Sequence, residues 1–360
     1  MLRLLAISPR RKIVGLVDLY QNCGTNLRIG SVMRESVSII ICLFEPGDFL
    51  ARQIKALQAQ QAPPELQWEV LYVDNTAQGK HKKTIIEAST EKVSIKYLHE
   101  PNPGKCRANN LAIGVAKGEV LLFTDEDVLP GKGWVHAMSW PILNGDADVV
   151  NADIELPEEL RRPWMGPIHK TIFMDRLGKD ALLKAVLGSN AAIKRDILLS
   201  IGGYDPELGP GRLGAGEDSL LGFQLQRLAC RFFFAGEEAT VLHCVSKERF
   251  KRETFIRYAK LAACSDAYIK YHWNHKSEHL AWLKALKSLI GLWWVRATRK
   301  YKCSEGILPN EHYQISRIWY LRQFNKEQRR QHNYLEPGCI KVHGELPQLG
   351  YKETEGTMQA

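Results

Sequence analysis

The feature that most constrains the fold is a series of apolar, β-branched runs, two of which lead directly into acidic residues. The runs are 37–44, 68–73 and 120–123; Asp74 follows the second and Asp125 lies just beyond the third. Runs that are apolar at nearly every position are typical of strands covered on both faces, as in a parallel sheet. Such strands predict an α/β domain with helices on both sides of the sheet.

Helical patterns separate these runs. Leu50, Ile54 and Leu57 share one face of a helix expected at about 49–61, which Pro63 and Pro64 end. The alternation of strand and helix predicts a Rossmann-like, mixed but mostly parallel sheet flanked by helices over 36–250. Further helices are expected at about 82–89, 104–117, 195–199 and 220–228, and further strands near 95–98, 148–152, 191–193, 232–234 and 240–242.

The ends of the chain differ from this pattern. We expect an N-terminal extension at 1–35, a helical C-terminal region at 251–325 and a polar tail at 326–360. The net charge of +9 fits nucleic acid, an anionic membrane surface or a phosphate-bearing ligand equally well. The eight cysteines form no CxxC pair, which disfavours a structural zinc site and favours free thiols in a reducing compartment.

The apolar runs are too short for a membrane-spanning helix, which needs roughly 18 residues, and the start of the chain is too short a run for a signal peptide. We therefore expect a cytoplasmic protein, either soluble or peripheral at the inner face of the membrane. The basic, apolar stretch 280–300, with Trp293 and Trp294, is the candidate for membrane contact. A helix packed on the catalytic domain is the slightly favoured alternative, since most such stripes belong to a core.

Three acidic residues in a row, Asp125, Glu126 and Asp127, come at the end of a predicted strand. Ligands of open α/β sheets bind beyond the carboxyl ends of the strands. Two aspartates two residues apart can share a hard divalent cation, which prefers oxygen ligands and bridges diphosphate oxygens. Mn²⁺ or Mg²⁺ is the expected cofactor. For so short a motif, a solvated acidic turn is an equally good explanation.

Asp74 and Phe44 end the second and first predicted strands. A carboxylate at Asp74 can accept a hydrogen bond from a ring N–H of uracil, thymine or guanine, and Phe44 can stack on the base. Taken singly, each residue is better explained structurally, Asp74 as a turn or helix cap and Phe44 as a core aromatic.

Glu217 and Asp218 follow Gly216 where a helix is expected to begin. A helix start holds a carboxylate rigidly, as a general base requires, although first-turn acids often serve only as caps. His243 ends an apolar strand, where a neutral imidazole can complete a cation's ligand set or pack as a core histidine. Taken alone, the core histidine is the better explanation.

The segment 209–214 reads Gly-Pro-Gly-Arg-Leu-Gly and fits the dinucleotide-binding pattern GxGxxG. No strand is predicted before it, a proline occupies the turn, and it lies far beyond the first strand–helix unit. We therefore reject a nicotinamide cofactor and expect a mobile, glycine-rich loop that can close over a ligand.

In combination these motifs resemble family 2 glycosyltransferases of the GT-A fold, over about residues 36–245. Each piece is short, and the resemblance depends on their order and spacing. The pieces are 37–44, 69–74, Asn102-Pro103-Gly104-Lys105 through Asn110, 118–127, Gly202-Gly203-Tyr204-Asp205, Gly216-Glu217-Asp218 and His243.

The resemblance implies roles for these residues. Asp218, next to Glu217, would be the catalytic base of an inverting, single-displacement transfer, and Asp127 would make the main metal contact. Two features depart from the family: 42–45 reads Cys-Leu-Phe-Glu in place of a Pro-Thr-Tyr-Asn-like sequence, and Asn109 stands where an arginine is common. The implied donor-binding residues are Phe44, Glu45, Asp74, Lys105, Asp125 and Glu126, and the implied metal ligands are Asp125, Asp127 and His243.

The resemblance therefore predicts transfer of a sugar from a nucleotide-sugar, with a UDP-sugar favoured, to a hydroxyl of a sugar or lipid-linked acceptor. Bacterial polysaccharide or glycolipid assembly is the commonest use of such enzymes. Two alternatives remain: a non-catalytic protein that binds sugar nucleotides or polysaccharides, and a nucleotidyltransferase on a similar sheet. A nucleic-acid partner is not expected, because the sequence holds no known reader motif.

Overall fold

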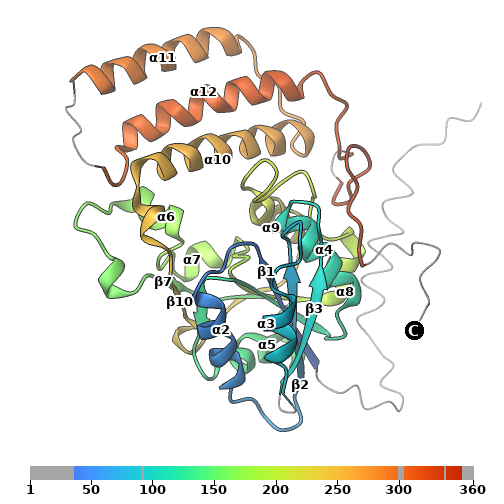
Figure 1. The fold of residues 1–360 in the computed structure, drawn as a ribbon. Coiled ribbons are helices and arrows are strands. Elements are labelled where there is room, and N and C mark those ends of the chain that lie inside the picture. Colours follow the sequence, from blue (N-terminus) through green and yellow to red (C-terminus); the bar gives the residue numbers. More distant parts are fainter. Residues whose placement is uncertain (1–35, 91–92, 299–303, 336–337, 351–360) are drawn as a thin grey trace, which may run out of the picture. The chain divides into compact units, whose positions relative to one another are not determined.

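The computed structural model describes residues 36–90, 93–298, 304–335 and 338–350, so the expected extension at 1–35 lies outside the described residues. Its centre is a seven-stranded mixed sheet of order β3-β2-β1-β4-β8-β6-β9, accompanied by a three-stranded sheet of order β5-β10-β7 (Figure 1). The strands are β1 (Ser36–Leu43), β2 (Gln67–Asp74), β3 (Ser94–His99), β4 (Val120–Asp125), β5 (Val128–Pro130), β6 (Val149–Asn151), β7 (Ile154–Glu155), β8 (Asn190–Lys194), β9 (Phe232–Phe234) and β10 (Val241–His243).

The expected α/β architecture is confirmed, and the first four strands run parallel. β1 lies between β2 and β4, which places Leu43 opposite Asp74 on one side and Cys42 opposite Asp125 on the other. The acidic ends of β2 and β4 therefore lie at the same edge of the sheet, because the carboxyl ends of parallel strands coincide. β8 is antiparallel to both β4 and β6, which makes the sheet mixed.

Helices cover both faces of the sheet. Ile39 and Ile41 of β1 pack into a core with α2, α3 and α5, while Ile40 packs into a second core with α4, α8 and α9. Successive residues of a strand point to opposite faces, which explains why three consecutive isoleucines are all buried. The helices are α2 (Phe49–Gln58), α3 (Lys82–Glu87), α4 (Lys105–Val115), α5 (Trp134–Leu143), α6 (Pro167–Phe173), α7 (Lys179–Leu182), α8 (Arg195–Ile201) and α9 (Glu217–Arg227), with short 3₁₀ turns η1 (Glu158–Leu160), η2 (Glu237–Ala239) and η3 (Lys247–Phe250).

The expected helical C-terminal region consists of α10 (Arg252–His272), α11 (Ala281–Thr298) and α12 (Pro309–Glu327). α12 packs between α10 and α11, and α11 is the helix farthest from the sheet (Figure 1). Only Ser288 of α11 is buried. The favoured expectation, a stripe packed into the core, is therefore wrong for α11: Trp293 and Trp294 are 64% and 59% exposed.

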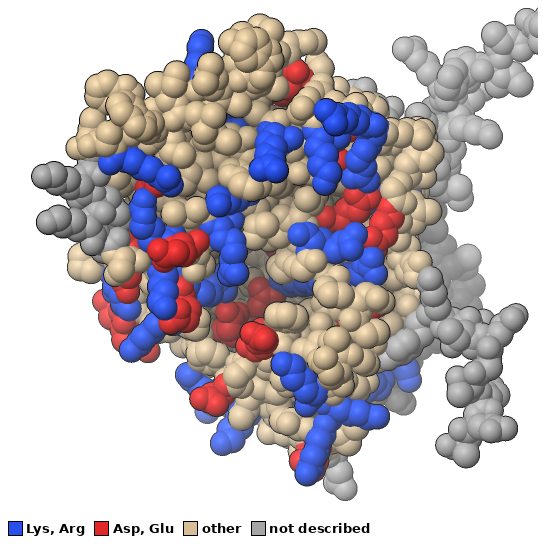
Figure 2. Space-filling view, turned by 45° about the horizontal axis from the view of Figure 1, so that its top comes forward, with Lys and Arg blue, Asp and Glu red and all other residues tan. Residues whose placement is uncertain are grey.

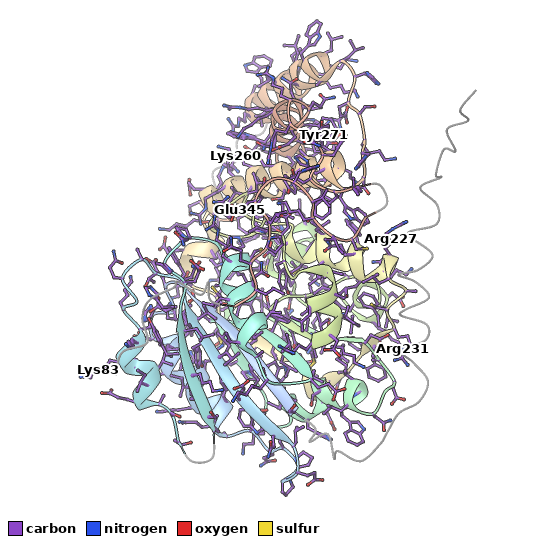
Figure 3. The ribbon with its side chains drawn as sticks, turned by 90° about the vertical axis from the view of Figure 1, so that its right-hand side faces the viewer. Lys83, Arg227, Arg231, Lys260, Tyr271 and Glu345 are labelled. Atoms are coloured by element: carbon purple, nitrogen blue, oxygen red, sulfur yellow. The ribbon has the colours of Figure 1, made fainter. Side chains whose placement is uncertain are left out.

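The polar tail expected at 326–360 is also wrong where the structure describes it. Asn333, Tyr334 and Lys341 are buried. The segment 338–350 returns to the α/β domain, where Glu345 pairs with Arg107 of α4 and Arg212. Figure 3 shows Glu345 at the junction of the α/β domain with the C-terminal helices. Ion pairs anchor this segment, and Cys339 and Leu349 also pack against the core that contains α4, α8 and α9.

Candidate active site

Asp125 ends β4 and is held by two side chains that are distant in sequence. Lys105 Nζ forms a short ion pair with Asp125 Oδ1, and Ser189 Oγ donates to Asp125 Oδ2 over 2.6 Å. Lys105 is the first residue of α4, and Ser189 precedes the antiparallel strand β8. The side chain of Lys105 is only 14% exposed. A largely buried cation therefore lies at the sheet edge beside the predicted diphosphate-binding aspartate.

Asp127 belongs to a separate cluster. Its Oδ2 lies 3.5 Å from His243 Nε2 and 3.3 Å from Arg249 Nη1. His243 is close because β10 pairs with β5, with His243 opposite Val128. Burial acts to raise the pKa of Asp127, but the hydrogen bond and charge of His243 and the charge of Arg249 outweigh it and hold the pKa at about 2. Asp127 is therefore an anion throughout the physiological range.

Asp218 and Glu217 open α9, as the sequence predicts. The backbone N–H of Gly188 donates to Asp218 Oδ2 over 2.9 Å. A side chain at Gly188 would clash, because a Cβ there would lie 2.5 Å from Asp218 Oδ1. Burial is the largest cause that raises the pKa of both carboxyls, and Asp218 further raises that of Glu217, to about 7. α9 thus presents a buried acid, Glu217, and a half-buried acid, Asp218, both of weakened acidity.

Lys105 joins the acids of β4 and α9 into one cluster. Burial alone would lower the pKa of Lys105, but the charges of Asp125, Asp218 and Glu217 raise it above its ordinary value. Figure 2 shows acidic side chains at the floor of a hollow that Lys and Arg side chains surround. A cationic rim over an acidic floor suits a ligand that carries phosphates and binds through or beside a cation.

Glu126, a predicted donor contact, makes its contacts within the protein. Its carboxylate accepts the backbone N–H of Phe44 over 2.7 Å and that of Glu45 over 3.2 Å. Burial raises the pKa of Glu126 to about 7. Glu126 therefore ties the end of β4 to the end of β1, and it leaves the Phe44 ring 55% exposed beside the site.

Asp74 also makes contacts within the chain. Its Oδ1 accepts from the N–H and the hydroxyl of Thr76, and its Oδ2 accepts from the N–H of His81 over 2.8 Å and from Tyr97 Oη over 3.4 Å. The residue is fully buried. Asp74 thus has the capping role that the sequence analysis gave as an alternative. Both of its carboxylate oxygens accept hydrogen bonds from the loop before α3.

The glycine-rich segment 209–214 precedes α9 and packs against the start of α4. Lys105 N donates to Pro210 O over 3.0 Å. Gly211 has a φ of +83°, and a Cβ there would lie 2.9 Å from the backbone nitrogen of Gly104. The element before this segment is α8 (Arg195–Ile201), not a strand. The predicted mobility of this loop stays a prediction.

The three predicted metal ligands are not assembled into one set. Among the residues that the structure describes, no group of three or more His, Cys, Asp or Glu side chains could hold a metal ion. Asp127 and His243 lie side by side, whereas Asp125 is paired with Lys105 and Ser189. One carboxylate and one imidazole fit a cation whose remaining ligands come from a diphosphate and water.

Sequence reasoning missed four residues of the site. Gly188, Ser189 and Arg249 contact Asp218, Asp125 and Asp127. Tyr258 of α10 is the fourth: burial raises its pKa, and the charges of Glu217 and Asp218 add to that rise while Arg249 opposes it. None of the four lies in a local motif, since each reaches the site through a distant strand or helix.

Comparisons with known proteins bear on this fold and site. A model of the glycosyl transferase family 2 matches residues 38–202. Glycosyltransferase GlyG of Streptococcus pneumoniae serotype 4 is 24% identical over 119 residues, which are 33% of this chain and 38% of that protein. Mannosyltransferase PcManGT from Pyrobaculum calidifontis, solved with GDP-Man and Mn²⁺, superposes with a TM-score of 0.51 at 16% identity and covers 88% of this chain and 96% of its own.

A crystal structure of S. aureus TarS gives a TM-score of 0.44 at 16% identity and covers 78% of this chain and 47% of its own. The chain thus spans less than half the length of GlyG and of this TarS structure. The sheet order and the helices on both faces are those of the GT-A fold. The match to the glycosyl transferase family 2 model covers a little under half of the chain.

Proposed function

We propose that the chain is an inverting glycosyltransferase that moves a sugar from a UDP-sugar to a hydroxyl of a carbohydrate or lipid-linked acceptor. The observation that carries the proposal is the cluster of Asp125, Asp218 and Lys105 at the carboxyl edge of the sheet, beside Asp127. A single in-line displacement needs a base on the acceptor side and charge compensation on the leaving-group side. This cluster offers groups of both kinds.

Asp218 is proposed as the base. Its carboxylate takes the proton of the acceptor hydroxyl while the acceptor oxygen bonds to the anomeric carbon. The bond from that carbon to the diphosphate oxygen breaks, and its electron pair leaves with the nucleoside diphosphate. Burial, which raises the pKa of Asp218, makes it a stronger proton acceptor than an exposed aspartate, and the N–H of Gly188 orients it.

Lys105 and Asp127 are proposed to act on the leaving-group side. Lys105 places a positive charge at the sheet edge, and Asp127 with His243 would hold a divalent cation, Mn²⁺ or Mg²⁺. When bound, such a cation neutralises charge on the departing diphosphate. The Mn²⁺ and GDP-Man in the PcManGT structure support a divalent cation and a nucleotide-sugar donor here too. A GDP-sugar is therefore the comparison for UDP-sugars in any binding assay.

The two alternatives predict different behaviour. A nucleotidyltransferase binds triphosphate with backbone N–H groups after its first strand, but those of Phe44 and Glu45 are taken by Glu126. A non-catalytic binding protein would hold the donor without turnover. Slow hydrolysis of a sugar nucleotide by the purified chain would separate the transferase from both alternatives. Polysaccharide or glycolipid assembly is proposed as the setting of the reaction.

The decisive experiment replaces Asp218 with asparagine. General-base removal is expected to lower turnover by about 10²–10⁴-fold, while calorimetry shows unchanged donor affinity. Asp196→Asn is the matched control, because Asp196 is also the second residue of its helix, α8, but is exposed. Turnover of Asp218→Asn equal to that of the control would remove Asp218 from the base role.

A further inference from the structure

Helix α11 carries a continuous apolar face that no described residue covers. Seven large apolar side chains between Leu280 and Trp294 are from 48% to 68% exposed, whereas Leu283 and Leu292 are half-buried. The exposed residues of this group are Leu280, Trp282, Leu286, Leu289, Ile290, Trp293 and Trp294.

The opposite side of α11 meets α12. Ser288 is buried, and a Cβ at Gly291 would lie 2.9 Å from Gln314 Cδ, so the two helices approach closely there. With 3.6 residues per turn, the exposed apolar side chains occupy an arc of about 140° on the other side of the helix. α11 therefore packs on α12 with one side and leaves the apolar arc on its other side uncovered by described residues.

The charges of α11 are of one sign. Ala281–Thr298 contains Lys284, Lys287 and Arg296 and no acidic residue. At 3.6 residues per turn, Lys287 and Arg296 fall on the two borders of the apolar arc. Arg296 Nε also lies 3.1 Å from Glu311 Oε1 of α12, and Lys284 Nζ lies 2.6 Å from Glu278 Oε2, so Lys287 is the cation of α11 that forms no ion pair with an acid among the described residues. Figure 2 agrees: the upper part of the molecule shows few charged side chains, and Lys and Arg side chains lie below it.

We propose that α11 docks this chain on a bilayer surface with anionic headgroups, with the helix lying in the plane of the interface. An apolar face bordered by cations, with tryptophans near both ends, fits the boundary between headgroups and acyl chains. At about 1.5 Å per residue the helix is too short and too charged to cross, and none of the described helices is long and apolar enough to span a membrane.

A second copy of the chain is a poorer occupant of this face. Two α11 helices packed face to face bring the Lys287 side chains of both copies together, and neither helix carries an acidic residue to offset them. A bilayer with anionic lipids instead supplies the opposite charge. Because α12 and α10 lie between α11 and the sheet (Figure 1), a bilayer on the outer side of α11 leaves the acidic site uncovered.

Vesicle flotation of the full chain tests the proposal. We expect binding to vesicles of phosphatidylglycerol and phosphatidylcholine that is at least tenfold stronger than to phosphatidylcholine alone, and that weakens as salt rises. Trp282→Ser with Trp293→Ser is expected to lower the partition coefficient at least tenfold. The matched control is Trp140→Ser with Phe233→Ser, which alters two exposed aromatics, 43% and 40% exposed, on other elements.

Three results would overturn the proposal: no flotation with anionic vesicles, equal losses in the tryptophan and control variants, or a dimer in light scattering that only the α11 variant abolishes. Full binding of a Lys287→Glu variant to anionic vesicles would show that attraction to anionic headgroups does not contribute to docking. The outcome is independent of the proposed reaction, because donor hydrolysis is expected to be unchanged in the Trp282→Ser/Trp293→Ser variant.

Discussion

Replacing Lys341 with methionine would remove a cation buried among carboxylates. Lys341 Nζ lies 2.6 Å from Asp205 Oδ1 and 3.2 Å from Glu207 Oε1, and the side chains of Lys341 and Asp205 are each 1% exposed. Removal of one partner from a buried ion pair costs about 3–5 kcal/mol, because the other charge stays buried. Tyr268 and Tyr334 still donate to Asp205 over 2.8 and 2.7 Å, so we expect a loss near about 3 kcal/mol.

The same network also makes the free energy of unfolding depend on pH in the acid range. Burial acts to raise the pKa of Glu207, but Lys341, the N–H of Glu345 and Arg330 lower it from 4.5 to about 2. A folded-state pKa below the unfolded value contributes stability that is full above about pH 4.5 and is lost as pH falls toward 2. That contribution is about 3 kcal/mol. In Lys341→Met this acid-dependent loss is expected to be smaller, since the principal cation is gone.

Urea unfolding at neutral pH and at pH 3 measures both effects. The midpoint for Lys341→Met is expected to fall without a change in the slope m. Lys341→Met combined with Asp205→Asn is expected to recover part of the loss, because the stranded charge is then absent. Lys83→Met is the control: Lys83 points into solvent (Figure 3), its side chain is 87% exposed, and no measurable change is expected. A loss in Lys341→Met no larger than this would refute the docking of 338–350.

The remaining predictions concern the site. Gly188→Ala places a Cβ 2.5 Å from Asp218 Oδ1 and is expected to lower kcat at least tenfold. The control is Gly131→Ala, where a Cβ meets nothing within 4 Å and kcat is expected to be unchanged. Equal rates in the two variants would argue against Asp218 as the base. Lys105→Met is expected to weaken donor binding at least tenfold, because the carboxylates of Asp125, Asp218 and Glu217 then lose the cation beside them. Calorimetry measures this affinity, and an unaltered value would exclude Lys105 from the diphosphate site. EDTA is expected to weaken donor affinity at least tenfold in the wild type and little further in His243→Ala; EDTA-insensitive binding by the wild type would contradict the metal assignment.

Most of the α/β half could be predicted because its signals are local. β1, β2 and β4 are buried on both faces, so each appears in the sequence as a nearly continuous apolar run. The acids after those runs could be assigned to one edge, since parallel strands end together. The short strands β5 and β7 were missed, because β7 has two residues and β5 ends in Pro130, so neither forms an apolar run like Phe232–Phe234 of β9.

The site depends on pairings that no local pattern encodes. His243 reaches Asp127 only because β10 pairs with β5, and Ser189 reaches Asp125 only because β8 inserts beside β4. Those contacts join residues 116 and 64 positions apart, counted from their residue numbers. The sequence could name Asp125, Asp127 and His243 as candidates, but only the tertiary structure shows that Asp125 contacts Lys105 and Ser189 while Asp127 contacts His243.

By itself, the sequence determined which segments become buried strands and where acids follow them, because hydrophobic period and strand length are properties of short segments. Only the tertiary structure decided which side of α11 is covered, since an apolar stripe in the sequence does not show which surface packs against it. The tertiary structure also decided that 338–350 packs on the rest of the chain. From the sequence alone Lys341 would be taken for a surface cation, but in the structure it contacts Asp205 and Glu207. Burial of a charge depends on its partners, and in this chain those partners lie far away in sequence.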